Sequence, residues 1–122
     1  VLGDFSFYGK VITQGILRQL RGHKKLILGN HDRAHSKTWW KEAGFNEVYD
    51  YPIVLRDGVI LSHEPVKAKN LGSFMNIHGH IHGESMNDDN HINVGVDRYD
   101  FTPQSLEMVI ACFEFCDALL HN

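Results

Sequence analysis

The spacing of apolar and polar positions predicts helices in the first third of the chain and mostly paired strands after it. Over residues 10–21, Ile12, Ile16 and Leu20 recur every four residues with Leu17 beside them. This spacing predicts a helix with these side chains on one apolar face, and Gly22 ends it. Shorter apolar runs predict strands over 24–28, 47–55, 59–62, 74–77 and 92–96.

Capping residues mark two further helices. Ser36 is a favourable N-cap for a helix that continues to Ala43, and Gly44 can end it. Near the carboxyl end, Pro103 fits the first turn of a helix predicted over 104–120.

The order of the elements predicts the fold class. Asp57-Gly58 is a strong hairpin signal between two of the strands, so the later part of the chain contains paired strands. Helices alternate with strands earlier, and this combination indicates an α/β sandwich of two packed mixed sheets flanked by helices. At 122 residues without repeats or linkers, we expect one domain spanning 1–122.

Composition narrows the function classes. The net charge is −3, and the basic residues form only two short clusters, typical of solvated helix ends, which argues against strong binding to duplex nucleic acid. No apolar run is long enough to cross a bilayer, so we expect no membrane partner and a cytoplasmic location. Cys112 and Cys116 lie four apart in a predicted helix and are expected to be buried free thiols.

Polar residues follow four of the apolar segments, where ligands gather in α/β sheets. The four clusters are Gly3-Asp4, Gly29-Asn30-His31-Asp32, Ser62-His63-Glu64 and Gly79-His80-Ile81-His82. Carboxylate, amide and imidazole groups together suit a divalent cation. In an extended segment, the i, i+2 spacing of His80 and His82 places both on one face, about 7 Å apart, where they could serve two adjacent ions. Asp4 has two oxygens and could bridge such a pair.

The order GD, GNHD, a single histidine and then GHxH resembles the calcineurin-like metallophosphoesterases, in particular their compact bacterial and phage members. The matching segments span residues 3–97, including the stretch Asn93-Val94-Gly95-Val96-Asp97 after GHxH. Any one cluster alone would be a weak signal, whereas GNHD followed by GHIH in this order is specific. The resemblance implies the four-layer sandwich of that family.

The resemblance also implies a role for each matching residue. Asp4 corresponds to the carboxylate that bridges both metals, Asn30, His63 and His80 to the other ligands of the second metal, and His82 to a ligand of the first. His31 corresponds to the histidine that stabilises the transition state or protonates the leaving oxygen, with Asp32 behind it as the orienting carboxylate. Arg33 could touch a substrate phosphate, and a surface ion pair is an equal alternative.

The activity implied is hydrolysis of a phosphate ester, mono- or diester, by a metal-bound hydroxide at a dinuclear site. Two divalent ions are implied, with Mn²⁺ the usual one and Fe, Ni or Zn as alternatives. The substrate would be a small phosphate ester, with nucleotides among the candidates, and the sequence leaves the oligomeric state open.

The departure from the family pattern lies at the amino end. The family's Asp-x-His motif, which supplies two ligands of the first metal, belongs upstream of Asp4, where only three residues stand. We therefore expect the first strand to be absent and the first metal to keep only Asp4 and His82. The alternative is a non-catalytic metal-binding relative or fragment with one competent site. An amidohydrolase using His-x-His would need a barrel of about 250 residues, which this chain cannot form.

Overall fold

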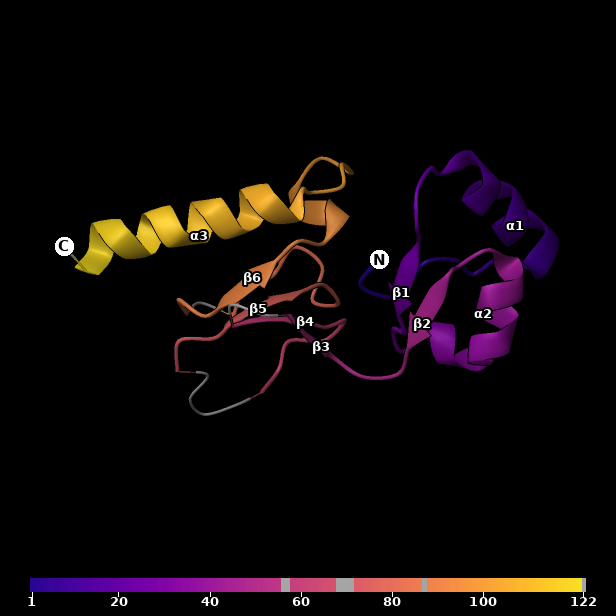
Figure 1. Cartoon of the computed structure of the whole chain (residues 1–122), viewed down its shortest axis with the longest axis horizontal. Helices are drawn as coiled ribbons and strands as arrows, with labels where there is room; N and C mark the ends of the chain where they lie inside the picture. The colour runs from indigo at the N-terminus through magenta and orange to yellow at the C-terminus, as the bar shows by residue number, and fades with distance from the viewer. Residues whose placement is uncertain (56–57, 68–71, 87, 122) are drawn as a thin grey trace.

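The computed structural model describes residues 1–55, 58–67, 72–86 and 88–121, and within them the chain is α/β with two small sheets (Figure 1). The elements in chain order are α1 (Lys10–Gln19), β1 (Lys25–Ile27), the 3-10 turn η1 (Asp32–Ala34), α2 (Lys37–Ala43), β2 (Glu47–Tyr49), β3 (Ile53–Leu55), β4 (Val59–Leu61), β5 (Met75–His78), β6 (His91–Asn93), the 3-10 turn η2 (Val96–Arg98) and α3 (Leu106–His121). The predicted α/β class with two sheets and flanking helices is confirmed at this level.

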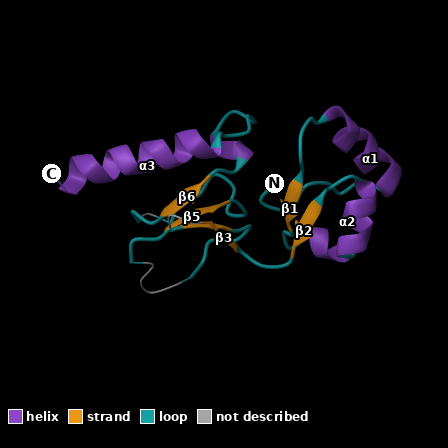
Figure 2. Ribbon diagram, viewed as in Figure 1, coloured by secondary structure: helices purple, strands orange, loops and turns teal. Residues whose placement is uncertain are grey.

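The first sheet pairs β1 with β2 in parallel, and α1 and α2 lie beside it (Figure 2). Its core consists of Leu17, Leu26, Leu28, Trp40, Ala43, Phe45 and Val48, with Phe5 and Trp39 packed against it.

The predicted buried face of α1 is confirmed at Leu17 and wrong at Ile12 and Leu20. Thr13 and Leu17 are the buried residues, whereas Ile12 and Leu20 are about half exposed. Thr13 is held inside because its hydroxyl group bonds the Ser6 hydroxyl at 2.9 Å and donates to a backbone carbonyl before the helix. Satisfying this buried hydroxyl rotates the helix away from the face that apolar spacing alone indicates.

The predicted caps of α2 are confirmed. The Trp39 amide donates to Ser36 Oγ at 3.1 Å, and Gly44 ends the helix with a φ of 137°, which a side chain rarely adopts. Trp40 is fully buried and its indole nitrogen donates to the Asp32 carbonyl at 2.9 Å. This bond ties α2 to the loop that follows β1.

The second sheet has the order β3-β4-β5-β6, with β3 antiparallel to β4 and the other neighbours parallel. One face packs on α3 around a core of Val59, Met75 and Ile77, which Val109, Ile110 and Phe113 of the helix cover in part. The antiparallel β3–β4 pair confirms the predicted hairpin, although Asp57 of its turn lies outside the described residues.

The predicted single strand over 47–55 is wrong, because it is two strands in different sheets. β2 pairs with β1 and β3 pairs with β4, with Pro52 between them. Proline has no N–H to donate to a ladder, so pairing is interrupted there and the chain passes from one sheet to the other.

Towards the carboxyl end, the strand predicted over 92–96 is shorter, because Val96 begins η2. Cys112 is exposed on α3, so the prediction of a buried thiol is wrong there. Among the described residues, no helix combines the length and apolar character that crossing a membrane requires.

Candidate metal centre

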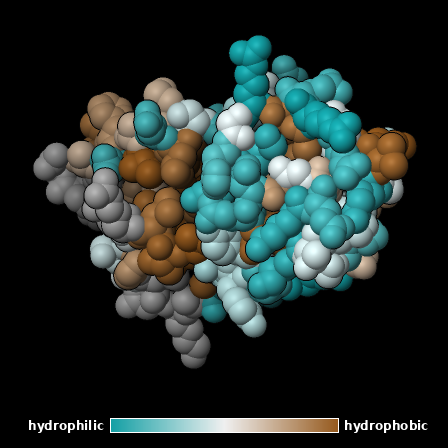
Figure 3. Space-filling view, turned by 45° about the vertical axis from the view of Figure 1, so that its right-hand side comes forward, coloured by the Kyte–Doolittle hydropathy of each residue, from teal (hydrophilic) through white to brown (hydrophobic). Residues whose placement is uncertain are grey.

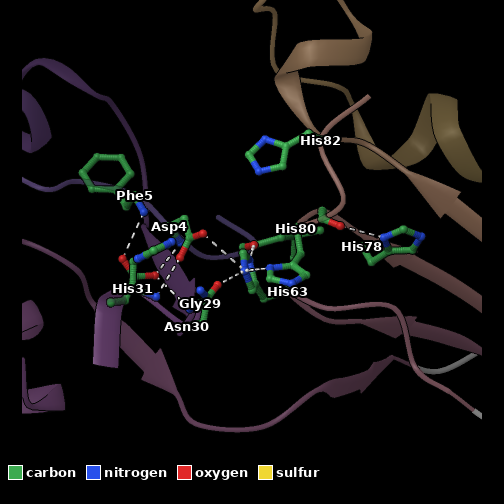
Figure 4. A network of polar contacts seen from close by, with 12 residues as sticks. Asp4, Phe5, Gly29, Asn30, His31, His63, His78, His80 and His82 are labelled. Atoms are coloured by element: carbon green, nitrogen blue, oxygen red, sulfur yellow. Dashed lines mark hydrogen bonds and ion pairs between the residues drawn. The ribbon is translucent and has the colours of Figure 1, made fainter. Parts of the chain in front are cut away.

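The first residues of the chain lie between the two sheets and carry Asp4 to their junction. The Ile27 amide donates to the Val1 carbonyl at 3.0 Å, which aligns the amino end with β1. Leu2 packs against the core of the second sheet, and its carbonyl accepts a bond of 2.7 Å from His63 Nδ1. This segment therefore brings the loop after β1 together with the loops of the second sheet (Figure 4).

Three polar atoms converge on one nitrogen of His63. His63 Nε2 lies 2.9 Å from Asn30 Oδ1, 3.0 Å from His80 Nδ1 and 3.4 Å from Asp4 Oδ2. The His63 ring is buried, and its other nitrogen donates to the Leu2 carbonyl, so in the neutral ring Nε2 carries the lone pair. Two of the three neighbouring atoms are oxygen acceptors, so lone pairs face one another across this point.

This arrangement fits a divalent cation. Asp4, His63 and His80 each offer one ligand atom, and the three atoms lie within 4.8 Å of one another. Neighbouring ligands bound to one ion at about 2.1 Å lie about 3.0 Å apart in octahedral and about 3.4 Å apart in tetrahedral geometry. The contacts around His63 Nε2 fall in this range, and a cation placed among them would satisfy lone pairs that cannot satisfy one another.

Unusual backbone conformations bring the ligands this close. Asp4 has a φ of 51° and His80 a φ of 68°, both in the left-handed region that non-glycine residues seldom adopt. Such conformations gather at functional sites because the surrounding structure must hold them. A side chain at Gly29 would overlap the Asp4 carboxylate, and one at Gly3 would overlap the His63 ring, so the close approach requires glycine at both positions.

Asp32 holds the backbone of the site rather than His31. Its buried carboxylate accepts bonds from the amides of Asp4 at 2.6 Å, Phe5 at 3.0 Å and Gly29 at 2.8 Å. The prediction that Asp32 orients the His31 ring is thus corrected, since among the described residues its carboxylate bonds these three backbone amides and not the His31 ring. These bonds fasten the segment that carries Asp4 to the loop that carries Asn30.

Replacing Asp32 by alanine is expected to lower the free energy of unfolding by about 3 kcal/mol or more, because each buried donor left unsatisfied costs about 1–3 kcal/mol. Urea denaturation measures the effect. Asp32→Asn keeps the shape of the side chain and one acceptor oxygen, so its free energy of unfolding should lie between those of the parent and Asp32→Ala. A variant that unfolds at the parent's urea midpoint, and alters only the pH profile of turnover, would restore the orienting role that the sequence suggested.

The structure does not bring His82 to the other predicted ligands. Its side chain is 85% exposed, and its Nδ1 lies 3.2 Å from Asp97 Oδ2. Figure 4 shows the ring apart from the group around His63. The predicted i, i+2 alignment assumed an extended segment, whereas Gly79–His82 forms a tight turn in which the Ile81 amide donates to the Gly79 carbonyl and His82 has a φ of 52°.

Of the remaining predicted residues, Arg33 lies in an ion pair and His31 stays accessible. Arg33 Nη2 donates to the Asp50 carbonyl at 2.6 Å, and Nη1 lies 3.8 Å from the Asp50 carboxylate. Of the two roles expected for Arg33, a phosphate contact or a surface ion pair, the structure shows the ion pair. The His31 amide donates to Asp4 Oδ1 at 3.0 Å, so its exposed ring stands beside the centre, edge-on to the exposed Phe7 ring.

Sequence reasoning missed a polar layer that supports the loops of the second sheet. Asn76 on β5 is fully buried; its Oδ1 accepts from the Val66 amide, and its Nδ2 donates to the Ile60 carbonyl and to Ser62 Oγ. These bonds hold the loop on both sides of His63. The available signal was a single polar residue, Asn76, within the otherwise apolar stretch predicted as a strand over 74–77, because a buried asparagine needs partners.

His78 lies in the same layer. Burial lowers the pKa of its imidazole, and its Nδ1–H donates to the Gly79 carbonyl at 2.9 Å. Among the described residues, its Nε2 is the buried side-chain atom without a hydrogen-bond partner. The ring is therefore a neutral support directly before the Gly79–His82 turn.

Comparison with known proteins gives a structural relative. A crystal structure of a protein of unknown function from Aquifex aeolicus, AQ665, is similar with a TM-score of 0.63 at 28% sequence identity, over 91% of this chain and 73% of that chain. No family model and no curated protein matches the chain. This similarity supports the α/β arrangement. It gives no information about activity, since the function of the relative is itself unknown.

Proposed function

We propose that this protein is a metal-dependent hydrolase of phosphate esters, of the calcineurin-like metallophosphoesterase kind. The observation that carries the proposal is the convergence of Asn30 Oδ1, His80 Nδ1 and Asp4 Oδ2 on His63 Nε2. These four residues match ligands of that family, in the family's order, and come from separate loops. The proposal includes the family's four-layer sandwich as the arrangement to which the two small sheets belong.

In this proposal Asp4, Asn30, His63 and His80 hold a divalent ion, with Mn²⁺ as the first choice and Fe, Ni or Zn as alternatives. A divalent ion bound there would polarise a phosphoryl oxygen and lower the pKa of a water molecule. Asp4 is held in place by the His31 amide through one oxygen, which leaves the other directed at His63. This division suits a carboxylate that contacts the ion with a fixed orientation.

His31 would donate a proton to the leaving oxygen or hold its developing charge. Its ring is exposed beside the centre and is not one of the atoms that converge on His63, so it is free to meet a substrate. Asp32 would act through the backbone by fixing Asp4 and Gly29. A small phosphate ester, including a nucleotide, could reach a ring placed in this way.

A second candidate is a metal-binding protein without turnover and with one competent site. The observation that favours it is the position of His82, whose exposed ring pairs with Asp97 instead of joining the centre. Under this candidate the first metal of the family, to which His82 was assigned, has no complete ligand set among the described residues.

The two candidates are separated by measuring metal binding and hydrolysis on the same preparation. The hydrolase should cleave bis(p-nitrophenyl) phosphate when Mn²⁺ is added, lose activity with a chelator, and regain it when Mn²⁺ is restored. Binding of one equivalent of Mn²⁺ with no hydrolysis above a His63→Ala preparation would favour the second candidate. Neither binding nor hydrolysis with Mn²⁺, Zn²⁺, Ni²⁺ or Fe²⁺ would refute both.

A further inference from the structure

Helix α3 carries apolar side chains on two sides, and only one of these sides packs on the second sheet. Its inner side chains contact the sheet core, while Met108, Phe115 and Leu119 are 64%, 65% and 67% exposed on the outer side. Cys112 is exposed with them. We call Met108, Cys112, Phe115 and Leu119 the α3 stripe. A contiguous exposed apolar patch marks an interaction surface, so this stripe calls for a partner.

The stripe has the spacing of a helix-pairing seam. Its residues are separated by four, three and four positions, which is the alternation of core positions in a two-stranded coiled coil. Along one flank of the seam the positions are occupied by small residues, Ala111 and Ala118, which permit close approach of a second helix on that side. Glu107 and Glu114 fall outside the seam.

The charges of α3 identify the kind of partner. Residues 106–121 contain no lysine or arginine, whereas helices that lie on lipid surfaces carry basic residues on their polar face. The carboxylates of Glu107 and Glu114 are off the seam, so two such helices can pair without opposing them. The stripe thus suits an uncharged apolar helix better than a membrane or a basic surface.

We propose that the partner is a second copy of this chain, with the two α3 helices antiparallel about a two-fold axis. In the register centred between Cys112 and Phe115, Met108 lies opposite the partner's Leu119 and Cys112 opposite the partner's Phe115. Cys112, the small residue of the stripe, then faces the larger Phe115, and the contact is self-complementary, as a two-fold interface requires. The antiparallel direction also places the positive end of each helix dipole beside the negative end of the other.

The exposed area sets the strength to expect. Figure 3 shows apolar surface gathered on the side of the molecule that carries α3 and the second sheet. Pairing of the stripes would bury about 1,000 Å² in total, which is at the lower limit for a specific protein interface. The dimer should therefore form reversibly and depend on protein concentration.

Sedimentation velocity of the whole chain from micromolar to millimolar concentration tests the proposal. The mass should rise with concentration towards twice the chain mass of 13.9 kDa. Phe115→Glu should keep the mass of one chain throughout, while Phe7→Glu, the same change at a 77% exposed phenylalanine away from α3, should associate like the parent. Circular dichroism of both variants shows that the fold is retained.

Oxidative cross-linking tests the register. In a Cys116→Ala background, Phe115→Cys should form a disulfide-linked dimer with the partner's Cys112, while the background protein alone should stay unlinked. Cross-linking of the background protein through Cys112 would indicate a parallel pair and overturn the register. A parent that keeps the mass of one chain at every concentration, or that binds phosphatidylcholine vesicles through Phe115, would overturn the dimer.

Discussion

His63→Ala is expected to lower the affinity for Mn²⁺ by at least about 100-fold, because loss of even a supporting residue around a metal ligand costs about 10–100-fold. His63 Nε2 is the atom on which Asn30, His80 and Asp4 converge, and no other described side chain occupies that central position. Isothermal titration calorimetry of the parent and the variant measures the affinity, with Zn²⁺ as a second probe.

The matched control for this experiment is His23→Ala. The side chain of His23 is 59% exposed, and its ring pairs with Glu47 at the start of β2 rather than with any predicted ligand. The His23→Ala variant should bind Mn²⁺ with the affinity of the parent protein. Equal loss of affinity in both variants would point to surface histidines as the binding groups, and retention of affinity by His63→Ala would remove the proposed centre.

His31→Ala is expected to lower turnover of a phosphodiester by about 100-fold or more while the bound metal is retained, which is the usual effect of losing a general acid–base group. The imidazole is replaceable without touching the converging atoms, because it is the backbone amide of His31 that bonds Asp4. Metal analysis and steady-state rates on one preparation measure both quantities.

The leaving group distinguishes a proton donor from a structural role. Loss of rate in His31→Ala should be large with a poor leaving group, such as an alkyl alcohol, and small with p-nitrophenol, which needs little protonation. His35→Ala, in the same loop and stacked on Trp39, serves as the control and should change neither rate. An equal loss with both leaving groups would count against proton donation by His31.

Several elements followed from local sequence alone. Ser36 and Gly44 define α2 because the cap bond and the left-handed end involve only neighbours within one or two turns. The β3–β4 pair likewise depends on a short connection, and β4 was predicted close to its observed bounds. The order of Asp4, Asn30, His63 and His80 at the ends of apolar segments indicated the members of the centre, since sheet edges collect such loops.

Other features were decided by contacts distant in the sequence. The face that α1 buries depends on a hydroxyl bond between Thr13 and Ser6, and the division of 47–55 into two strands depends on which sheet offers a free edge on each side of Pro52. The periodicity of apolar residues predicts neither the buried face of α1 nor the division of residues 47–55, because it shows which positions are apolar and not which residues pack against them.

The candidate site divides in the same way between sequence and tertiary structure. Sequence determined the ligand types and their order, because the chemistry of a divalent cation restricts them to a few side chains. Tertiary structure decided two further features. The Asp32 carboxylate binds three backbone amides because the fold buries these donors around it, and His82 turns away from His80 because the backbone there forms a left-handed turn. A buried carboxylate takes the donors that the folded backbone brings to it, and those donors come from residues that only the fold makes neighbours.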